Sequence, residues 1–186
     1  DWSSDVCSSD LWNSSRNPMN PCKCLSQKAF SNTPALGVVF DVNVYLDALL
    51  HKGDKFPELV KVPPTTGMAP RDCLSLAFDA DRFSLHISPH IIENIADVLH
   101  KVGLPAKLIG ESLQALVEIV QVSGGTVVAP PRLAFDSKDF EDNLVLDLLK
   151  YTDSKVLVTS DKGLLALNPW NHRLILSPMD FLEHIL

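Results

Sequence analysis

The sequence lacks any apolar run long enough to cross a bilayer, so we do not expect an integral membrane protein. It also lacks a positively charged start followed by an apolar core, which is the pattern of a secretory signal. Cysteine is scarce, with four residues in 186, and the Cys22-x-Cys24 pair has no second half with which to form a zinc knuckle. We therefore expect no disulfide framework, and we predict a reducing, cytoplasmic location.

Positive charge is also in short supply. The formal net charge of −7 argues against broad, charge-driven binding of nucleic acid. A metal-dependent nuclease is still compatible with this balance, because acids that hold cations count against the net charge while the bound metals reverse the local sign. The six histidines show no metal-ligand spacing to one another, which disfavours a zinc enzyme.

The composition, with 46% hydrophobic and 21% charged residues, is that of one ordinary folded domain with a real core. Residues 1–34 are rich in Ser, Asn and Pro and have no periodicity. We expect this segment to be disordered or foreign to the natural chain, with Met19 as a candidate start. The folded domain is predicted to span residues 35–186.

Short apolar strands and amphipathic helices alternate along that domain. Strands are predicted over 38–40, 83–87, 126–128, 156–160 and 173–176, and helices over 44–51, 56–62, 71–79, 88–101, 105–122, from Asp139, and over 162–165 and 178–186. The proline-rich stretch 63–70 is predicted to be a surface loop. This alternation indicates an α/β fold, with a mostly parallel sheet covered by helices on both faces.

Two predicted strands deliver an aspartate at their ends. In GVVFDVNVYL, Asp41 follows a buried apolar run, and in VLVTSD, Asp161 does the same. Ligands of open α/β sheets bind outside the carboxyl ends of the strands, so both positions are functional candidates. Two carboxylates brought close together repel each other unless a cation or a shared proton intervenes, and a divalent metal is the simplest resolution.

Four acidic motifs together resemble those of the PIN domain family, and most of all those of the toxin components of bacterial toxin–antitoxin pairs. The motifs are FDVN, SPHIIEN, DFEDN and VTSD, and the resemblance covers roughly residues 36–180. It implies a three-layer α/β/α sandwich around a mostly parallel sheet and metal-dependent cleavage of RNA. It also implies that the acidic positions are Asp41, Glu93, Asp142 and Asp161, with Asn43 as the polar residue beside the first.

Carboxylate oxygens are hard ligands that suit Mg²⁺ or Mn²⁺. A water activated by such a metal would attack the phosphodiester without needing a 2′-hydroxyl, so the expected products are a 5′-phosphate and a 3′-hydroxyl. We expect Asp41 and Asp161 to be direct ligands, and Glu93 and Asp142 to be ligands through water or orienting groups. Thr159, Ser160 and Asn43 are candidates to orient the substrate or its waters.

Each candidate has a structural alternative. Asp142 could serve the N-terminus of its helix, close to a capping box with Asp139, and Asp161 could cap the short helix after it. Asn43 could cap a helix beginning at Val44. Glu93 could be a solvated helix residue, and the helical wheel does not prefer it to Asp97. Asp139, Glu141 and Asp147 are predicted to be surface charges.

Two other functions remain open. A phosphatase of the haloacid dehalogenase type also starts with a strand-end aspartate, but it needs a second aspartate where this chain has Asn43. A PIN-like scaffold could instead bind RNA or protein without cleaving. By resemblance, the partners of a nuclease would be RNA, a small antitoxin protein and a second copy in a homodimer. The 63–70 stretch and the acidic balance set the chain apart from short toxins, which leaves an RNA-processing role open.

Overall fold

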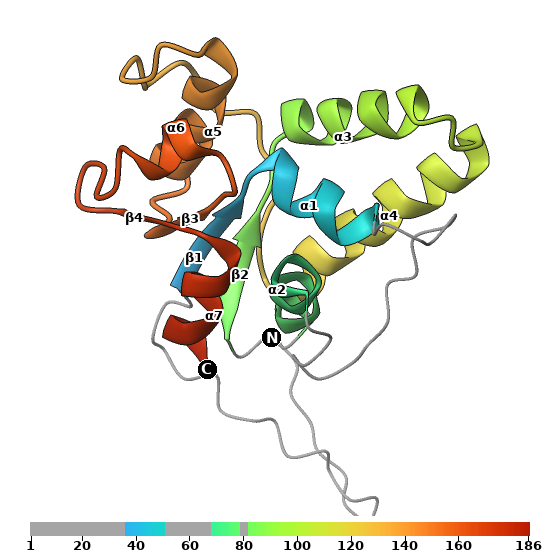
Figure 1. The fold of residues 1–186 in the computed structure, drawn as a ribbon, viewed down its shortest axis with the longest axis horizontal. Coiled ribbons are helices and arrows are strands. Elements are labelled where there is room, and N and C mark those ends of the chain that lie inside the picture. Colours follow the sequence, from blue (N-terminus) through green and yellow to red (C-terminus); the bar gives the residue numbers. More distant parts are fainter. Residues whose placement is uncertain (1–35, 51–67, 79–81) are drawn as a thin grey trace, which may run out of the picture. The chain divides into compact units, whose positions relative to one another are not determined.

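The computed structural model describes residues 36–50, 68–78 and 82–186. Its sheet has four strands in the order β2-β1-β3-β4, and every pairing is parallel (Figure 1). The strands are β1 Leu36–Phe40, β2 Phe83–His86, β3 Val156–Val158 and β4 Leu174–Leu176. Consecutive residues of β1 and β3 are buried although they point to opposite faces, so the sheet is covered on both sides. This is the predicted three-layer α/β/α fold.

Seven helices are described, and they pack on the sheet and on one another. They are α1 Val42–Leu49, α2 Ala69–Ala77, α3 Pro89–Lys101, α4 Ala106–Val122, α5 Phe140–Tyr151, α6 Lys162–Leu165 and α7 Pro178–Ile185. Helix α5 contacts β1, α2 contacts β2, and α7 contacts both α2 and β4. Within the described ranges, none of the helices has the length and apolar composition required to cross a bilayer.

An aromatic group fills the core between the sheet and α7. The rings of Phe40, Phe83 and Phe181 contact one another with centroid distances of 5.4 to 5.9 Å, and Tyr45 lies 5.9 Å from Phe40. All four side chains are fully buried. This packing anchors the end of β1, which is where the first candidate acid follows.

The start of α3 was predictable because its cap is a local interaction. Ser88 accepts a hydrogen bond from the backbone N–H of Ile91 at 3.3 Å, and Pro89 occupies the first helical position. The helix ends at Lys101, and Gly103 follows with φ +89°. In Figure 1, α1 and α3 begin at the same edge of the sheet, where β1 and β2 end.

Two predictions of elements were wrong. The strand predicted over 126–128 is a single bridge between Ile87 and Val127, and Pro130 and Pro131 follow, which have no N–H with which to extend a ladder. Helix α2 starts at Ala69, inside the predicted 63–70 loop, because Pro70 is tolerated in a first turn whose N–H groups need no partner. The predictions for 1–34, for 56–62 and for most of the loop fall outside the described residues.

Candidate functional site

The buried aspartate at the end of β1 is the centre of the site. Asp41 is 7% exposed, and it is the N-cap of α1, because its Oδ1 accepts the backbone N–H of Val42 at 2.7 Å. Its Oδ2 accepts from the hydroxyl of Thr159 at 2.7 Å and from the side-chain amide of Asn43 at 3.3 Å. Asn43 therefore orients Asp41, and the alternative that Asn43 caps this helix was wrong.

The register of the sheet explains how Thr159 reaches Asp41. Phe40 pairs with Val158, and the backbone N–H of Asp41 donates to Val158 O at 2.9 Å, so the next residue of each strand lies side by side. The Thr159 hydroxyl also accepts the backbone N–H of Asp161 at 3.0 Å. Thr159 thus connects the two strand-end acids from a fully buried position. Ser160 is exposed and does not line the cavity described below.

Asp161 and Asp142 reach the same small space from different helices. Asp161 caps α6, as its structural alternative predicted, because its Oδ1 accepts the backbone N–H groups of Gly163 at 2.6 Å and Leu164 at 3.1 Å. A Cβ added to Gly163 would lie 2.9 Å from Asp161 Oδ1 and 3.8 Å from Asp142 Oδ2. Both carboxylates therefore lie close to Gly163.

Asp142 does not cap its own helix. Asp139 caps α5 by accepting the backbone N–H of Glu141 at 2.9 Å, while Asp142 Oδ2 accepts the Ser137 hydroxyl at 2.8 Å. The capping part of the alternative for Asp142 was therefore wrong, but Asp142 does lie in the first turn of α5, where a negative charge stabilises the helix N-terminus. Its side chain is directed toward the site and is oriented there by a hydroxyl from the preceding loop.

These acids line a cavity of about 330 Å³. Among the described residues that line it, six carry carboxylates, namely Asp41, Asp97, Asp139, Glu141, Asp142 and Asp161, whereas only His90 and Lys101 can carry positive charge. A concave site with this excess of negative charge attracts cations.

Glu93 is the sequence-predicted acid that the structure does not bring to the cavity. Its side chain is exposed and is not part of the lining, whereas Asn94 and Asp97 of the same helix line it. Helix α3 turns the stripe His90, Asn94, Asp97 and Lys101 toward the cavity, with the spacing of three to four residues that marks one helical face. Asn94 and Asp97 were not among the predicted site residues, although the helical wheel gave no reason to prefer Glu93 to Asp97.

Burial and mutual repulsion both favour the protonated forms of two of the acids. Desolvation raises the pKa of Asp41; hydrogen bonds from Thr159 and Val42 partly oppose this, and the charges of Asp142 and Asp161 add to it. Desolvation also raises the pKa of Asp142, with opposition from the Ser137 hydroxyl and support from Asp161 and Asp139. The three central carboxylates therefore interact electrostatically, and a cation among them would relieve their repulsion.

Comparison with known proteins identifies the family. A family model described as PIN domain matches residues 37–163, which is well over half of the chain and includes every acid of the cavity. The chain belongs to the PIN domain family. PIN domains are generally nucleases and typically use divalent metals. A search of individual curated proteins finds no match.

The donor chemistry of this PIN domain fits a hard divalent cation, because all the central side chains offer carboxylate oxygens. In the part of the chain that the structure describes, however, no three His, Cys, Asp or Glu side chains are grouped closely enough to hold a metal ion. Asp41, Asp142 and Asp161 are each held by hydrogen bonds to protein groups.

A polar cluster joins α3 to α5 at the rim of the PIN domain's cavity. His90 Nε2 contacts Glu141 Oε2, and the Asn94 side-chain amide donates to the same oxygen at 3.1 Å. Asn94 also lies 3.0 Å from His90 Nε2. Because His90, Asn94 and Glu141 come from the two helices that border the cavity, their contacts connect its two sides.

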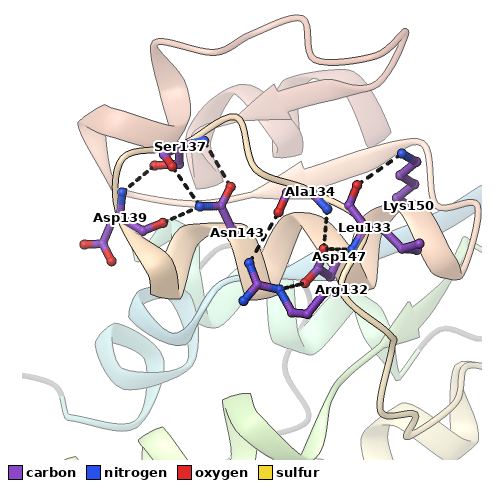
Figure 2. A network of polar contacts seen from close by, with 8 residues as sticks. All are labelled: Arg132, Leu133, Ala134, Ser137, Asp139, Asn143, Asp147 and Lys150. Atoms are coloured by element: carbon purple, nitrogen blue, oxygen red, sulfur yellow. Dashed lines mark hydrogen bonds and ion pairs between the residues drawn. The ribbon is translucent and has the colours of Figure 1, made fainter.

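One acid of α5 has a structural role that the sequence did not suggest. Asp147, predicted to be a surface charge, is fully buried, whereas Asp139 and Glu141 are exposed as predicted. Its Oδ1 accepts the backbone N–H groups of Leu133 at 2.6 Å and Ala134 at 2.5 Å (Figure 2). Its Oδ2 lies 2.8 Å from Arg132 Nε, in an ion pair without the alignment of a hydrogen bond. Asp147 therefore fixes the extended segment that precedes the site.

One turn earlier, Asn143 fixes the loop between that segment and α5. Its amide donates to Ser137 O at 2.8 Å and to Asp139 O at 2.7 Å, and its oxygen accepts the Ser137 N–H at 3.0 Å (Figure 2). This holds the Ser137 hydroxyl where Asp142 needs it. The only signal in the sequence was that Asn143 and Asp147 are four residues apart and so share one face of α5.

Proposed function

We propose that this PIN domain is a metal-dependent endoribonuclease. The observation that carries the proposal is the cavity at the carboxyl end of the parallel strands, in which a buried aspartate is surrounded by further carboxylates. Ligands of open α/β folds bind at this place. A negatively charged cavity repels an RNA phosphate unless cations are bound in it, so a divalent metal is part of the proposal.

Asp41, Asp142 and Asp161, with Asp97 in the place first expected of Glu93, would hold Mg²⁺ or Mn²⁺. The bound metal would supply positive charge for the phosphodiester and an acidified water. Hydrolysis by water leaves a 5′-phosphate and a 3′-hydroxyl, without participation of the ribose 2′-hydroxyl.

The surrounding residues orient the acids. Thr159 and Asn43 donate to Asp41 Oδ2, and Ser137 donates to Asp142, so these two carboxylates are held before any ligand arrives. Lys101, on the rim, can meet a phosphate that lies across the cavity. Thr159, Asn43 and Ser137 are expected to position the carboxylates and Lys101 to bind the RNA phosphate, while the acids hold the metal.

We further propose the partners of a toxin-like nuclease. A small antitoxin protein could silence the enzyme by placing a basic side chain among the cavity's carboxylates, where its charge would be compensated. A homodimer is proposed from the family resemblance. An RNA-processing role remains a second biological setting for the same chemistry, and the compartment proposed for either is the cytoplasm.

A non-cleaving RNA- or protein-binding module is the competing function. It is favoured by one observation, the absence of a metal-sized group of acids among the described residues. A phosphatase of the dehalogenase type is not favoured, because Asn43 cannot act as the second acid and instead donates to Asp41.

The deciding experiment is a cleavage assay on single-stranded RNA labelled at one end, with Mg²⁺, Mn²⁺ or EDTA. We expect internal cleavage with either metal and none in EDTA, and we expect Asp41→Asn and Asp142→Asn each to lower the rate at least about 100-fold. Circular dichroism would verify that both variants fold. Cleavage that persists in EDTA and in both folded variants would contradict the mechanism, and no cleavage by wild-type protein would favour the binding module.

A further inference from the structure

Two exposed phenyl rings contact one guanidinium group near the acid cavity. The Arg132 guanidinium carbon lies 4.5 Å from the ring centroid of Phe140 and 5.2 Å from that of Phe135. Phe140 is 58% exposed and Phe135 is 75% exposed, so most of each residue is open to solvent. Burial of either ring would remove a large apolar surface from water, so this exposure indicates an interaction site.

The Arg132 guanidinium is held in place by an ion pair and a backbone hydrogen bond. Arg132 Nε lies 2.8 Å from Asp147 Oδ2, and Asp147 is itself buried and fixed by two backbone N–H groups. An Arg132 terminal nitrogen also donates to Ala134 O at 3.4 Å. Since the group is already ordered, a ligand that stacks here has little side-chain freedom to remove.

The position of this group ties it to the cavity. Asp139 and Glu141, the residues on either side of Phe140, both line the cavity. Phe140 is not itself part of the lining, but it is the first residue of α5 and stands between these two in the chain. A strand whose phosphodiester lies among the carboxylates would therefore pass close to the start of α5, from which the Phe140 ring projects.

The protein's negative net charge favours a ligand that is bound by stacking. With a net charge of −7 and a negative cavity, the protein gains no overall electrostatic attraction for a polyanion. Stacking of bases on aromatic and guanidinium groups is the part of single-strand binding that does not depend on net charge, and it tolerates any sequence.

We propose that Phe135, Arg132 and Phe140 form a stacking platform for an unpaired nucleobase of the RNA strand that enters the cavity. This rests on the proposed function in taking RNA as the ligand and the cavity as the place of its phosphodiester, but it does not require cleavage. The site favours single-stranded over duplex RNA, because paired bases keep their faces stacked within the helix.

The test measures binding separately from cleavage. The full chain is titrated into a fluorescein-labelled, unstructured RNA of about 12 nucleotides, in EDTA and again in calcium, and anisotropy is recorded. Phe140→Leu and Phe135→Leu are expected each to weaken binding at least about fivefold. Tyr151→Leu is the matched control, since Tyr151 is 52% exposed at the other end of α5, and it is expected to bind like the wild type.

An abasic nucleotide moved along the strand locates the stacked base. At one position it should weaken binding of the wild type but add nothing to the defect of Phe140→Leu, because both changes remove the same contact. Additive defects at every position would overturn the proposal. It would also be overturned by wild-type affinity in both phenylalanine variants, by an equal loss in Tyr151→Leu, or by no measurable RNA binding in either buffer.

Other outcomes distinguish the platform from the nuclease. RNA binding that depends on Phe140, without any metal-dependent cleavage, would refute the nuclease and support the platform. Metal-dependent cleavage, with wild-type RNA affinity in both phenylalanine variants, would support the nuclease and refute the platform. A concentration-dependent dimer that both phenylalanine variants abolish, with RNA affinity intact, would assign the rings to a protein interface and overturn the platform.

Discussion

At the scale of single residues, Thr159 connects two of the candidate acids through one hydroxyl group. Its one hydroxyl, which is fully buried, donates to Asp41 and accepts from the backbone of Asp161. It is a positioning residue, because it acts on the substrate only through the two acids.

We expect Thr159→Val to destabilise the protein by about 1 to 3 kcal/mol, because the buried Asp41 carboxylate and the half-buried Asp161 N–H each lose a partner. We also expect it to lower cleavage by about 10- to 100-fold, through weaker metal binding. Urea unfolding and the metal dependence of the rate measure the two effects. Thr159→Ser, which keeps the hydroxyl, should restore most of the metal affinity, and a defect equal to that of valine would contradict the bridging role.

A second prediction at this scale compares two acids of α3. Asp97→Asn should raise the metal concentration needed for cleavage, because this carboxylate lines the cavity, and Glu93→Gln should leave it unchanged, because Glu93 is exposed elsewhere. Both substitutions remove one charge, so long-range electrostatics are matched. If Glu93→Gln rather than Asp97→Asn raised the metal concentration needed for cleavage, Glu93 and not Asp97 would be the acid of α3 that belongs to the site.

These residues show how far the sequence could predict the site. Asp41 was predictable because a charged residue after a buried strand needs a partner, and Asp161 repeats the pattern. Glu93 was placed on the right helix, but which of several polar residues faces the cavity depends on the rotation of α3 about its axis. That rotation is set by packing of Ile91, Ile95 and Leu99 against other elements, which a local pattern does not specify.

At the scale of elements, α5 links the interior to the site. Asp147 ties it to the segment 132–134, and Asn143 ties it to the loop that orients Asp142 (Figure 2). A charge pattern on a helix is usually solvated, so a buried acid that serves the backbone of a distant segment could not be told apart from Asp139 or Glu141 by sequence. Caps such as Ser88, which depend on neighbours in the chain, could be predicted.

We predict that Asp147→Ala will destabilise the fold by about 3 to 5 kcal/mol, because it leaves two backbone N–H groups and the Arg132 charge without their partner. The free energy of unfolding in urea measures this. Glu111→Ala is the control, since Glu111 is exposed in an i,i+4 pair with Lys107 and should change stability little. Similar losses in the two variants would show that the Asp147 network does not stabilise the domain.

At the scale of the whole molecule, the crowded acids make stability depend on pH and metal. In the metal-free protein the pKa values of Asp41 and Asp142 are raised on folding, so the folded state binds more protons than the unfolded state above the ordinary aspartate range. Stability must therefore fall as pH rises through the window between the ordinary and the raised pKa, and it stays lower above that window.

We expect Asp142→Asn to remove part of this loss. Its stability relative to wild type, measured by urea unfolding in EDTA, should be more favourable at about pH 7 than at about pH 4, because only the wild type carries the extra charge at neutral pH. Excess Mg²⁺ should stabilise the wild type more than the variant, since a ligand that binds only the folded state adds to its stability. A stability difference that is the same at both pH values, together with equal stabilisation by Mg²⁺, would contradict the electrostatic account.

The parallel direction of the four described strands has a consequence for how such a molecule can diversify. Every connection that leaves the carboxyl end of a strand lies at the same end of the sheet, whereas the aromatic side chains around Phe40 are buried in the core. Substitutions or insertions in these connections can alter which ligand is accepted without disturbing the interior, so new specificities can be selected on an unchanged scaffold.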